Sequence, residues 1–272
     1  MDWNPKILER SAMFEPLRIC TAGWPAGGWP EPAALQLLLE QRDPSIRVST
    51  GAPLRVVPQL PGVKRSDLPY EERIYVQGEL QIRPGNWHDL FNFLVWLSFP
   101  RAKAALNARH HAASLERTST GASNRGPVED ALTLFDEGGV LVASASRELL
   151  DLLRAHEWKK LFWRRRREVL ESTRFWLFGH ALYEKALHPF MGITGRGICF
   201  DVDERFLRMP LATQLSELDG RVAEHIEASD RVTSPRDLLI VPILGVPGWC
   251  AENEIEHYYD NADQFRPRPN TR

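Results

Sequence analysis

The densest apolar part of the chain lies in residues 86–98, which read NWHDLFNFLVWLS. Asn86 is a favoured N-cap residue, so a helix is predicted from Trp87 to Ser98. Its apolar side chains fall on nearly every side of a helical wheel, which is typical of a helix at the centre of a core. The apolar run is about half the ~20 residues that a membrane span needs. We therefore expect a buried helix and no membrane-spanning segment.

Around this helix the sequence alternates between helical and strand-like segments. Further helices are expected over residues 32–40, 100–115, 147–154, 158–187 and 211–228. Two hairpins are expected, one joining residues 73–76 to 79–83 and one joining 131–135 to 140–143. An additional strand is expected over residues 198–202. The chain is therefore predicted to have an α+β fold, dominated by helices, with a small antiparallel sheet or hairpins.

Length and composition place the chain among globular proteins. It has 272 residues, of which 43% are hydrophobic and 26% are charged, with a formal net charge of -2. Such a chain can bury a core covering roughly 75% of its unfolded surface, which excludes a disordered protein. The near-neutral charge argues against a long-range electrostatic search for nucleic acid. The three scattered cysteines exclude a disulfide framework and are typical of reduced thiols.

We expect a single globular domain over residues 32–265. An aromatic and proline-rich arm, residues 1–31, is predicted to pack on this domain, and residues 266–272 are predicted to fray. The first residues lack the basic and apolar segments of a signal peptide, so a cytoplasmic location is expected. The sequence leaves the oligomeric state open.

Polar side chains interrupt the apolar helix and its neighbour. His88 and Asn92 lie one turn apart on the same face, and each needs a partner if it is buried. A core hydrogen-bond network or a catalytic site would supply that partner. Asp89 is placed where a carboxylate caps a helix, which is an alternative to a role as general base. On the next helix, Lys103 and Asn107 are candidates for orienting a substrate, with a solvated face as the alternative.

A second group of candidates follows the inward stripe of the helix expected over residues 158–187. Carried forward by 3.6-residue steps, that stripe reaches His180 and Glu184. The pair can bind a divalent metal, act as a base with its orienting carboxylate, or form a structural hydrogen bond. Gly179 beside them allows another backbone to come close.

Residues 158–167 form the strongest basic cluster, and aromatic residues are interleaved in it. Its cationic side chains are Lys159, Lys160, Arg164, Arg165, Arg166 and Arg167. Cationic side chains bind phosphates and aromatic rings stack on bases, so the cluster is a candidate anion-binding surface. Acidic residues at 157, 168 and 171 neutralise part of the charge, and an ordinary solvated face is the alternative.

The signature Asn-Trp-His-Asp-Leu-Phe-Asn at residues 86–92 is specific. It is accompanied by ALTLFDE at 131–137, FGHALYEK at 178–185 and GVPGW at 245–249. Together these blocks resemble one uncharacterised bacterial family, catalogued as domain of unknown function number three thousand and twenty-five. The resemblance spans most of the chain and implies a bacterial origin, but it implies no activity, cofactor or site residue.

From the residues themselves we predict a metal-assisted hydrolase that acts on an anionic, phosphoester-like substrate. The expected ligands of its divalent metal ion are His88, Asp136, His180 and Glu184. The expected catalytic groups are Asp89, Glu137, Asn92, Lys103 and Asn107, with Asp89 or Glu137 as the general base. The alternative is a non-catalytic protein whose basic stretch, residues 158–167, binds nucleic acid or another polyanion. A third alternative is that these polar residues only hold the core together.

Overall fold

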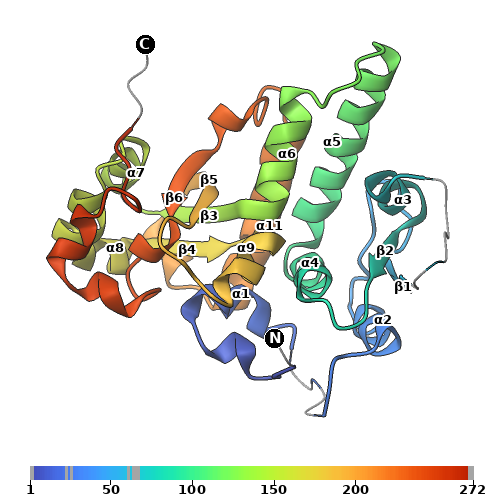
Figure 1. The fold of residues 1–272 in the computed structure, drawn as a ribbon, viewed down its shortest axis with the longest axis horizontal. Coiled ribbons are helices and arrows are strands. Elements are labelled where there is room, and N and C mark those ends of the chain that lie inside the picture. Colours follow the sequence, from blue (N-terminus) through green and yellow to red (C-terminus); the bar gives the residue numbers. More distant parts are fainter. Residues whose placement is uncertain (1–2, 22–23, 25–26, 60–61, 63–67, 269–272) are drawn as a thin grey trace.

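The computed structural model describes residues 3–21, 24, 27–59, 62 and 68–268 (Figure 1). Its larger sheet has four strands in the order β4-β3-β5-β6. Their bounds are β3 Gly139–Ser144, β4 Thr173–Leu177, β5 Thr194–Asp201 and β6 Leu239–Pro242. β3 runs antiparallel to β4 and parallel to β5, and β5 runs antiparallel to β6. A smaller sheet pairs β1 (Arg55–Pro58) and β2 (Glu79–Ile82) in parallel on the opposite side of the molecule.

Three helices stand between the two sheets (Figure 1). They are α4 Trp87–Ser98, α5 Pro100–Ser119 and α6 Pro127–Gly138, and α11 Leu211–Glu227 packs along α5. Further helices are α1 Glu15–Arg18, α2 Pro32–Glu40, α3 Tyr70–Gln77, α7 Arg147–Arg154, α8 Arg166–Ser172, α9 His180–Ala186 and α10 Glu204–Leu207. The predicted α+β fold dominated by helices is therefore confirmed. The pairing within the sheets is mixed, with antiparallel and parallel neighbours.

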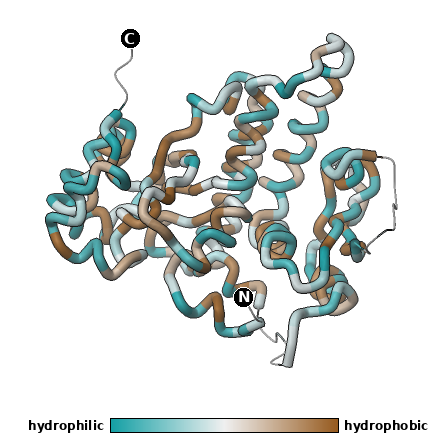
Figure 2. Tube along the Cα trace, viewed as in Figure 1, coloured by the Kyte–Doolittle hydropathy of each residue, from teal (hydrophilic) through white to brown (hydrophobic). Residues whose placement is uncertain are grey.

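The central helix α4 forms where the sequence predicts it. The side chain of Asn86 accepts a hydrogen bond from the backbone N–H of Asp89 at 3.0 Å, which is an N-cap interaction. Every residue of α4 except His88 and Asp89 is buried. Figure 2 shows apolar residues on α4 and along the strands of the larger sheet, where the core lies. The two polar residues at the start of α4 therefore face a space that is not filled by the core.

The hairpin predicted over residues 131–143 is wrong, because residues 127–138 form helix α6. Pro127 occupies the first helical turn, and the carboxylate of Glu129 accepts a hydrogen bond from the backbone N–H of Gly126 at 3.1 Å. Ala131, Leu132 and Phe135 then bury one face of the helix. β3 follows directly and is buried over its whole length between β4 and β5. Asp136 and Glu137 therefore lie in the last turn of a helix, not in a hairpin turn.

The single long helix predicted over residues 158–187 is also wrong. A π-helical turn, Lys160–Arg164, precedes α8, and the chain then becomes extended at Thr173. Residues 173–177 carry β-branched and aromatic side chains and pair with β3, which provides tertiary hydrogen bonds that a helix prediction does not consider. His180 and Glu184 consequently lie on α9, a separate short helix.

The hairpin predicted over residues 73–83 is replaced by helix α3 followed by β2. Gly78 ends α3 with a φ of 68°, and its N–H donates to the carbonyl of Ile74 at 2.8 Å. A Cβ at this position would lie 2.2 Å from the carbonyl oxygen of Pro53, so only glycine fits. This turn places β2 beside β1, and Tyr70 and Glu71 at the start of α3 face the centre of the molecule.

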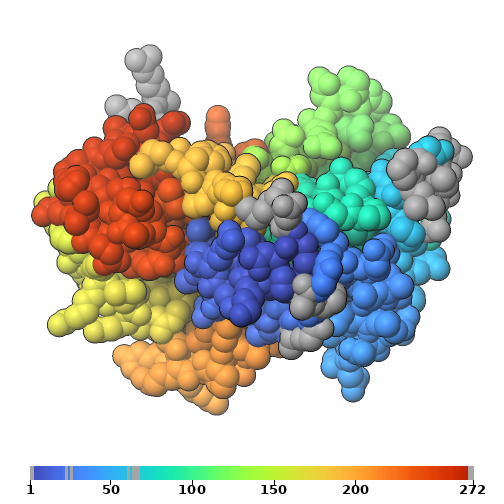
Figure 3. All heavy atoms as spheres, turned by 60° about the horizontal axis from the view of Figure 1, so that its bottom comes forward, coloured from blue at the N-terminus to red at the C-terminus, as the bar shows by residue number. Residues whose placement is uncertain are grey.

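The N-terminal residues pack on the rest of the chain through aromatic rings. Trp3 stacks on Trp87 with ring centroids 5.7 Å apart, and Phe14 stacks on Phe91 at 6.0 Å. Figure 3 shows this segment, in dark blue, between the C-terminal segment and the residues that precede β1. Of the predicted frayed end, residues 269–272 lie outside the described part. Among the described helices, none has the length and apolar character to span a bilayer.

Candidate functional site

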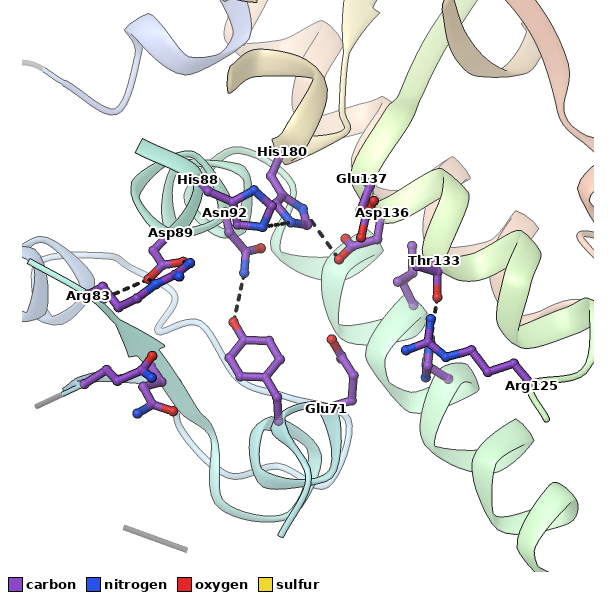
Figure 4. Close-up of a pocket in the computed structure, with 15 residues that line it drawn as sticks. Glu71, Arg83, His88, Asp89, Asn92, Arg125, Thr133, Asp136, Glu137 and His180 are labelled. Atoms are coloured by element: carbon purple, nitrogen blue, oxygen red, sulfur yellow. Dashed lines mark hydrogen bonds and ion pairs between the residues drawn. The ribbon is translucent and has the colours of Figure 1, made fainter. Parts of the chain in front are cut away.

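A polar cavity of about 320 Å³ lies between α3, β2, α4, α5, α6 and the first residue of α9. Residues far apart in the sequence meet at this cavity, as Figure 4 shows. The sequence candidates that line it are His88, Asp89, Asn92, Asp136, Glu137 and His180. The other three candidates do not line the cavity, but each contacts a residue that does. Glu184 contacts His88, Lys103 contacts Asp136, and Asn107 contacts Glu71. The residues proposed from the sequence for catalysis and metal binding are thus brought together around one pocket.

Two histidines face each other at the rim of this cavity. His88 lies in the first turn of α4 and His180 is the first residue of α9, and their Nε2 atoms are 3.1 Å apart. The rings meet edge to face, with an interplanar angle of 78°. The close approach depends on Gly179, because a Cβ there would lie 2.4 Å from the carbonyl oxygen of Glu137. The close backbone contact expected from the sequence at Gly179 is confirmed.

Each imidazole has a carboxylate behind its other ring nitrogen. The Nδ1 atom of His88 is 3.1 Å from Oε2 of Glu184, and the Nδ1 atom of His180 is 3.6 Å from Oδ2 of Asp136. A neutral imidazole has one N–H, and a neighbouring carboxylate favours that hydrogen on the nitrogen that faces it. The carboxylate at 3.1 Å favours the hydrogen on Nδ1 of His88, whereas Nδ1 of His180 has no hydrogen-bond partner among the described residues. The two Nε2 atoms form an N–H···N hydrogen bond if one of them carries a hydrogen, and both offer a lone pair to a shared cation if neither does.

Burial keeps His180 in its neutral form. Its side chain is 7% exposed, and this burial, reinforced by the charge of Lys103, lowers the pKa of His180 to about 4 although Asp136 opposes the shift. His88 is more accessible, with 35% of its side chain exposed to solvent. At neutral pH the inner ring is thus a lone-pair donor, and the outer ring is open to a ligand in the cavity.

A buried ion pair supports the inner histidine. Nζ of Lys103 bonds Oδ1 of Asp136, and their side chains are 4% and 14% exposed. Burial would raise the pKa of Asp136, but the neighbouring Lys103 charge outweighs it and holds that pKa below its usual range. Asp136 is therefore a carboxylate at neutral pH, and it is held in place behind His180. Lys103 is engaged in this pair and does not line the cavity.

The opposite wall contains groups that the sequence analysis did not propose, among them Glu71, which is the partner of Asn107, and His110. Asn107 donates from Nδ2 to the backbone carbonyl of Glu71 at 2.9 Å and to its Oε2 at 2.7 Å. His110 bonds the hydroxyl of Thr133 at 3.1 Å. Tyr70, Arg83 and Arg125 also line the cavity. His110 could have been found from the sequence, because it continues the line of Lys103 and Asn107 along α5. Tyr70 and Glu71 could not, because the sequence analysis predicted no helix at these residues.

Asp89 is held by an arginine. Oδ2 of Asp89 accepts from the backbone N–H and from Nε of Arg83, each at 2.8 Å, and Oδ1 accepts from Nη2 at 2.7 Å. The cap of α4 is Asn86, so Asp89 does not have the capping role that was its alternative. Glu137 is exposed and lines the cavity. Of the two candidate bases, Glu137 is therefore the one whose carboxylate is open to solvent at the pocket.

The four expected metal ligands do not form one cluster. In the described part of the chain, no three His, Cys, Asp or Glu side chains are grouped as metal ligands. Asp136 and Glu184 lie behind the rings, at the Nδ1 atoms, so they cannot bind the ion that the Nε2 atoms would share. These two carboxylates instead occupy the outer-shell position that typically orients a metal-binding histidine.

The basic stretch at residues 158–167 lies away from this cavity, beside α8 (Figure 1). Ion pairs engage four of its six cationic side chains. These pairs are Lys159 with Asp260, Arg165 with Glu168, Arg166 with Glu254, and Arg167 with Glu171. Within the described residues, Lys160 and Arg164 are in no ion pair. The stretch therefore presents less free positive charge than its sequence indicates.

The fold and the pocket define a helix-dominated α+β protein whose candidate site is a pair of histidines backed by carboxylates. The chain belongs to the family described as "Protein of unknown function (DUF3025)", which matches it over residues 54–269. This confirms the resemblance found in the sequence, and all the residues of the cavity lie inside the matched range. Among curated proteins and among solved structures, nothing matches the chain.

The raised pKa of Glu71 leads to a testable pH dependence. Burial, together with the nearby charge of Asp136, raises the pKa of Glu71. A carboxyl whose pKa is higher in the folded protein stabilises the fold below its unfolded pKa, and this contribution is lost as the pH rises through the folded value. We expect wild type to lose more free energy of unfolding than Glu71→Gln between about pH 4 and about pH 8.

Urea unfolding at the two pH values measures this difference. The control is Glu116→Gln, a matched substitution at an exposed position on α5. It should keep the pH dependence of wild type. A Glu71→Gln variant with the same pH dependence as wild type would show that Glu71 ionises as freely in the folded as in the unfolded chain.

Proposed function

We propose that this protein is a hydrolase that uses a divalent cation between His88 and His180 to cleave a small anionic, phosphoester-like substrate. The observation that carries the proposal is the convergence of the two Nε2 atoms at 3.1 Å, with a carboxylate near each Nδ1 atom. Two imidazole nitrogens 3.1 Å apart can each lie about 2.0–2.1 Å from one metal ion when the N–metal–N angle is bent, as in a tetrahedral site. Outer-shell carboxylates also make imidazole a stronger metal ligand.

The cavity supports hydrolysis of a small substrate. Its volume of about 320 Å³ lies at the lower end of the range for ligand pockets, so a small molecule or the end of a larger one fits. A bound divalent cation lowers the pKa of its water to ~7 and makes hydroxide available at neutral pH. Glu137 lines the pocket and is exposed, which supports its role in our proposal as the base that accepts the proton of that water.

An anionic substrate is favoured by the charges at the pocket. Neutral imidazoles do not reduce the charge of the cation that they bind. Arg125 lines the cavity, and no carboxylate among the described residues pairs with it. The polyanion-binding alternative has less support, because ion pairs engage most of the basic side chains in residues 158–167.

The test is the metal content of the untagged protein, measured by elemental mass spectrometry. We expect close to one equivalent of a transition metal in wild type, and almost none in His88→Ala and His180→Ala. Hydrolysis of a chromogenic phosphoester by the metal-loaded protein should fall more than ~100-fold in both variants, because losing even an outer-shell partner typically costs 10–100-fold.

The control variant is His257→Ala, at an exposed position in the C-terminal segment. It should keep the metal and the hydrolysis rate of wild type. If wild type neither contains nor takes up zinc, manganese or iron, and phosphoester hydrolysis does not respond to added metal, the proposed function is wrong.

A further inference from the structure

We infer that Oδ1 of Asn92 is the third protein ligand of the cation between His88 and His180, and that this ligand set selects a first-row transition metal over Mg²⁺ and Ca²⁺. The inference rests on the proposed function and adds a ligand and a metal class to it. It starts from the position of Asn92 on α4. Asn92 lies one helical turn after His88, on the same face, and lines the same cavity.

Asn92 has a buried carbonyl oxygen without a partner. The residue is 7% exposed, and its Nδ2 donates to the hydroxyl of Tyr70 at 3.0 Å. Among the described residues, Oδ1 of Asn92 has no hydrogen-bond partner. An unsatisfied buried polar group destabilises the fold, and a bound ion or water is one of its ordinary explanations. Figure 4 shows Asn92 beside the imidazoles of His88 and His180.

Three carboxylates that line the pocket are already engaged. Arg83 binds Asp89 with both Nε and Nη2, Lys103 binds Asp136, and Asn107 binds Glu71. Glu184 lies behind the ring of His88. Among the described residues that line the pocket, Asn92 has a buried amide oxygen without a hydrogen-bond partner, and it lies one helical turn from His88.

The chemistry of the three ligands determines which ions fit. Imidazole nitrogen suits zinc, iron, copper and nickel, whereas Mg²⁺ and Ca²⁺ prefer ligand sets made of oxygen. Two neutral imidazoles and one amide carry no net charge, so the ion keeps its full positive charge toward the cavity. Three protein ligands also leave a position open for water or a substrate anion, as in catalytic zinc sites. The set therefore fits a catalytic ion that attracts an anion.

The experiment is a titration of the metal-free full chain with Co²⁺, followed by its visible absorption bands. Co²⁺ reports both affinity and coordination. We expect Asn92→Leu to weaken binding by ~10–100-fold and to change the positions of the absorption bands. Asn92→Asp keeps an oxygen at the same place and is expected to restore binding and the band pattern. Millimolar Mg²⁺ should not displace Co²⁺ from wild type.

Controls separate this inference from the proposed function. His88→Ala should lose Co²⁺ binding altogether, and thermal unfolding of each metal-free variant checks that it is folded. If Asn92→Leu binds Co²⁺ with the affinity and spectrum of wild type while His88→Ala does not bind, the role of Asn92 is refuted and the histidine site stands. If wild type binds none of Co²⁺, Zn²⁺ and Mn²⁺, both proposals are refuted.

Discussion

Replacing Lys103 with methionine is expected to lower the free energy of unfolding by about 3–5 kcal/mol. Methionine keeps most of the aliphatic volume of lysine, so the change removes mainly the charge. Asp136 would then remain as a buried carboxylate without its partner, which is the situation in which breaking a buried ion pair is most destabilising. The variant also loses the contact of Nζ with the Trp96 ring, whose centroid is 5.6 Å away.

Urea unfolding measures the loss, and two further variants identify its cause. Lys103→Met combined with Asp136→Asn removes the uncompensated charge, so it should recover part of the lost stability. Lys185→Met, the same substitution at an exposed position of α9, should change the free energy of unfolding by less than about 0.5 kcal/mol. If the double variant is no more stable than Lys103→Met, then the loss comes from packing and not from the charge of Asp136.

Replacing Gly179 with alanine is expected to destabilise the protein by about 3 kcal/mol, at the upper end of overpacking effects. The added Cβ would lie 2.4 Å from the carbonyl oxygen of Glu137 and 2.4 Å from the backbone nitrogen of Gly139. Both atoms belong to the backbone at the junction of α6 and β3, so no side-chain rotation can relieve the contact. Either α9 or that junction must move, and His180, the next residue, moves with α9.

The effect should therefore appear in both stability and metal binding. Thermal unfolding and Co²⁺ titration of Gly179→Ala are expected to show a lower melting temperature and a weaker site. Gly126→Ala is the matched control, because a Cβ at Gly126 would have no atom within 4 Å. It should leave both measurements close to wild type. A Gly179→Ala variant as stable as wild type would mean that α9 can shift without loss.

The parts of the fold that the sequence predicts are those with strong local signals. Helix α4 has an Asn86 cap and an apolar surface on almost every side, and both its ends match the prediction. Helix α7 begins and ends where predicted because its leucines recur at helical spacing. His88 and Asn92 were identified because polar residues in an apolar helix need partners. These features depend on neighbours within a few residues, so one sequence contains enough information to find them.

The sequence alone therefore determined the central helix, the fold class and which polar residues need an explanation. Only the tertiary structure decided that residues 173–177 form a strand, because their hydrogen bonds go to β3 and not to neighbours along the chain. It also decided that His180 meets His88, which is 92 residues away in the sequence. Strand pairing and the contact at Gly179 produce that meeting, and both are interactions between distant segments, which no local pattern specifies.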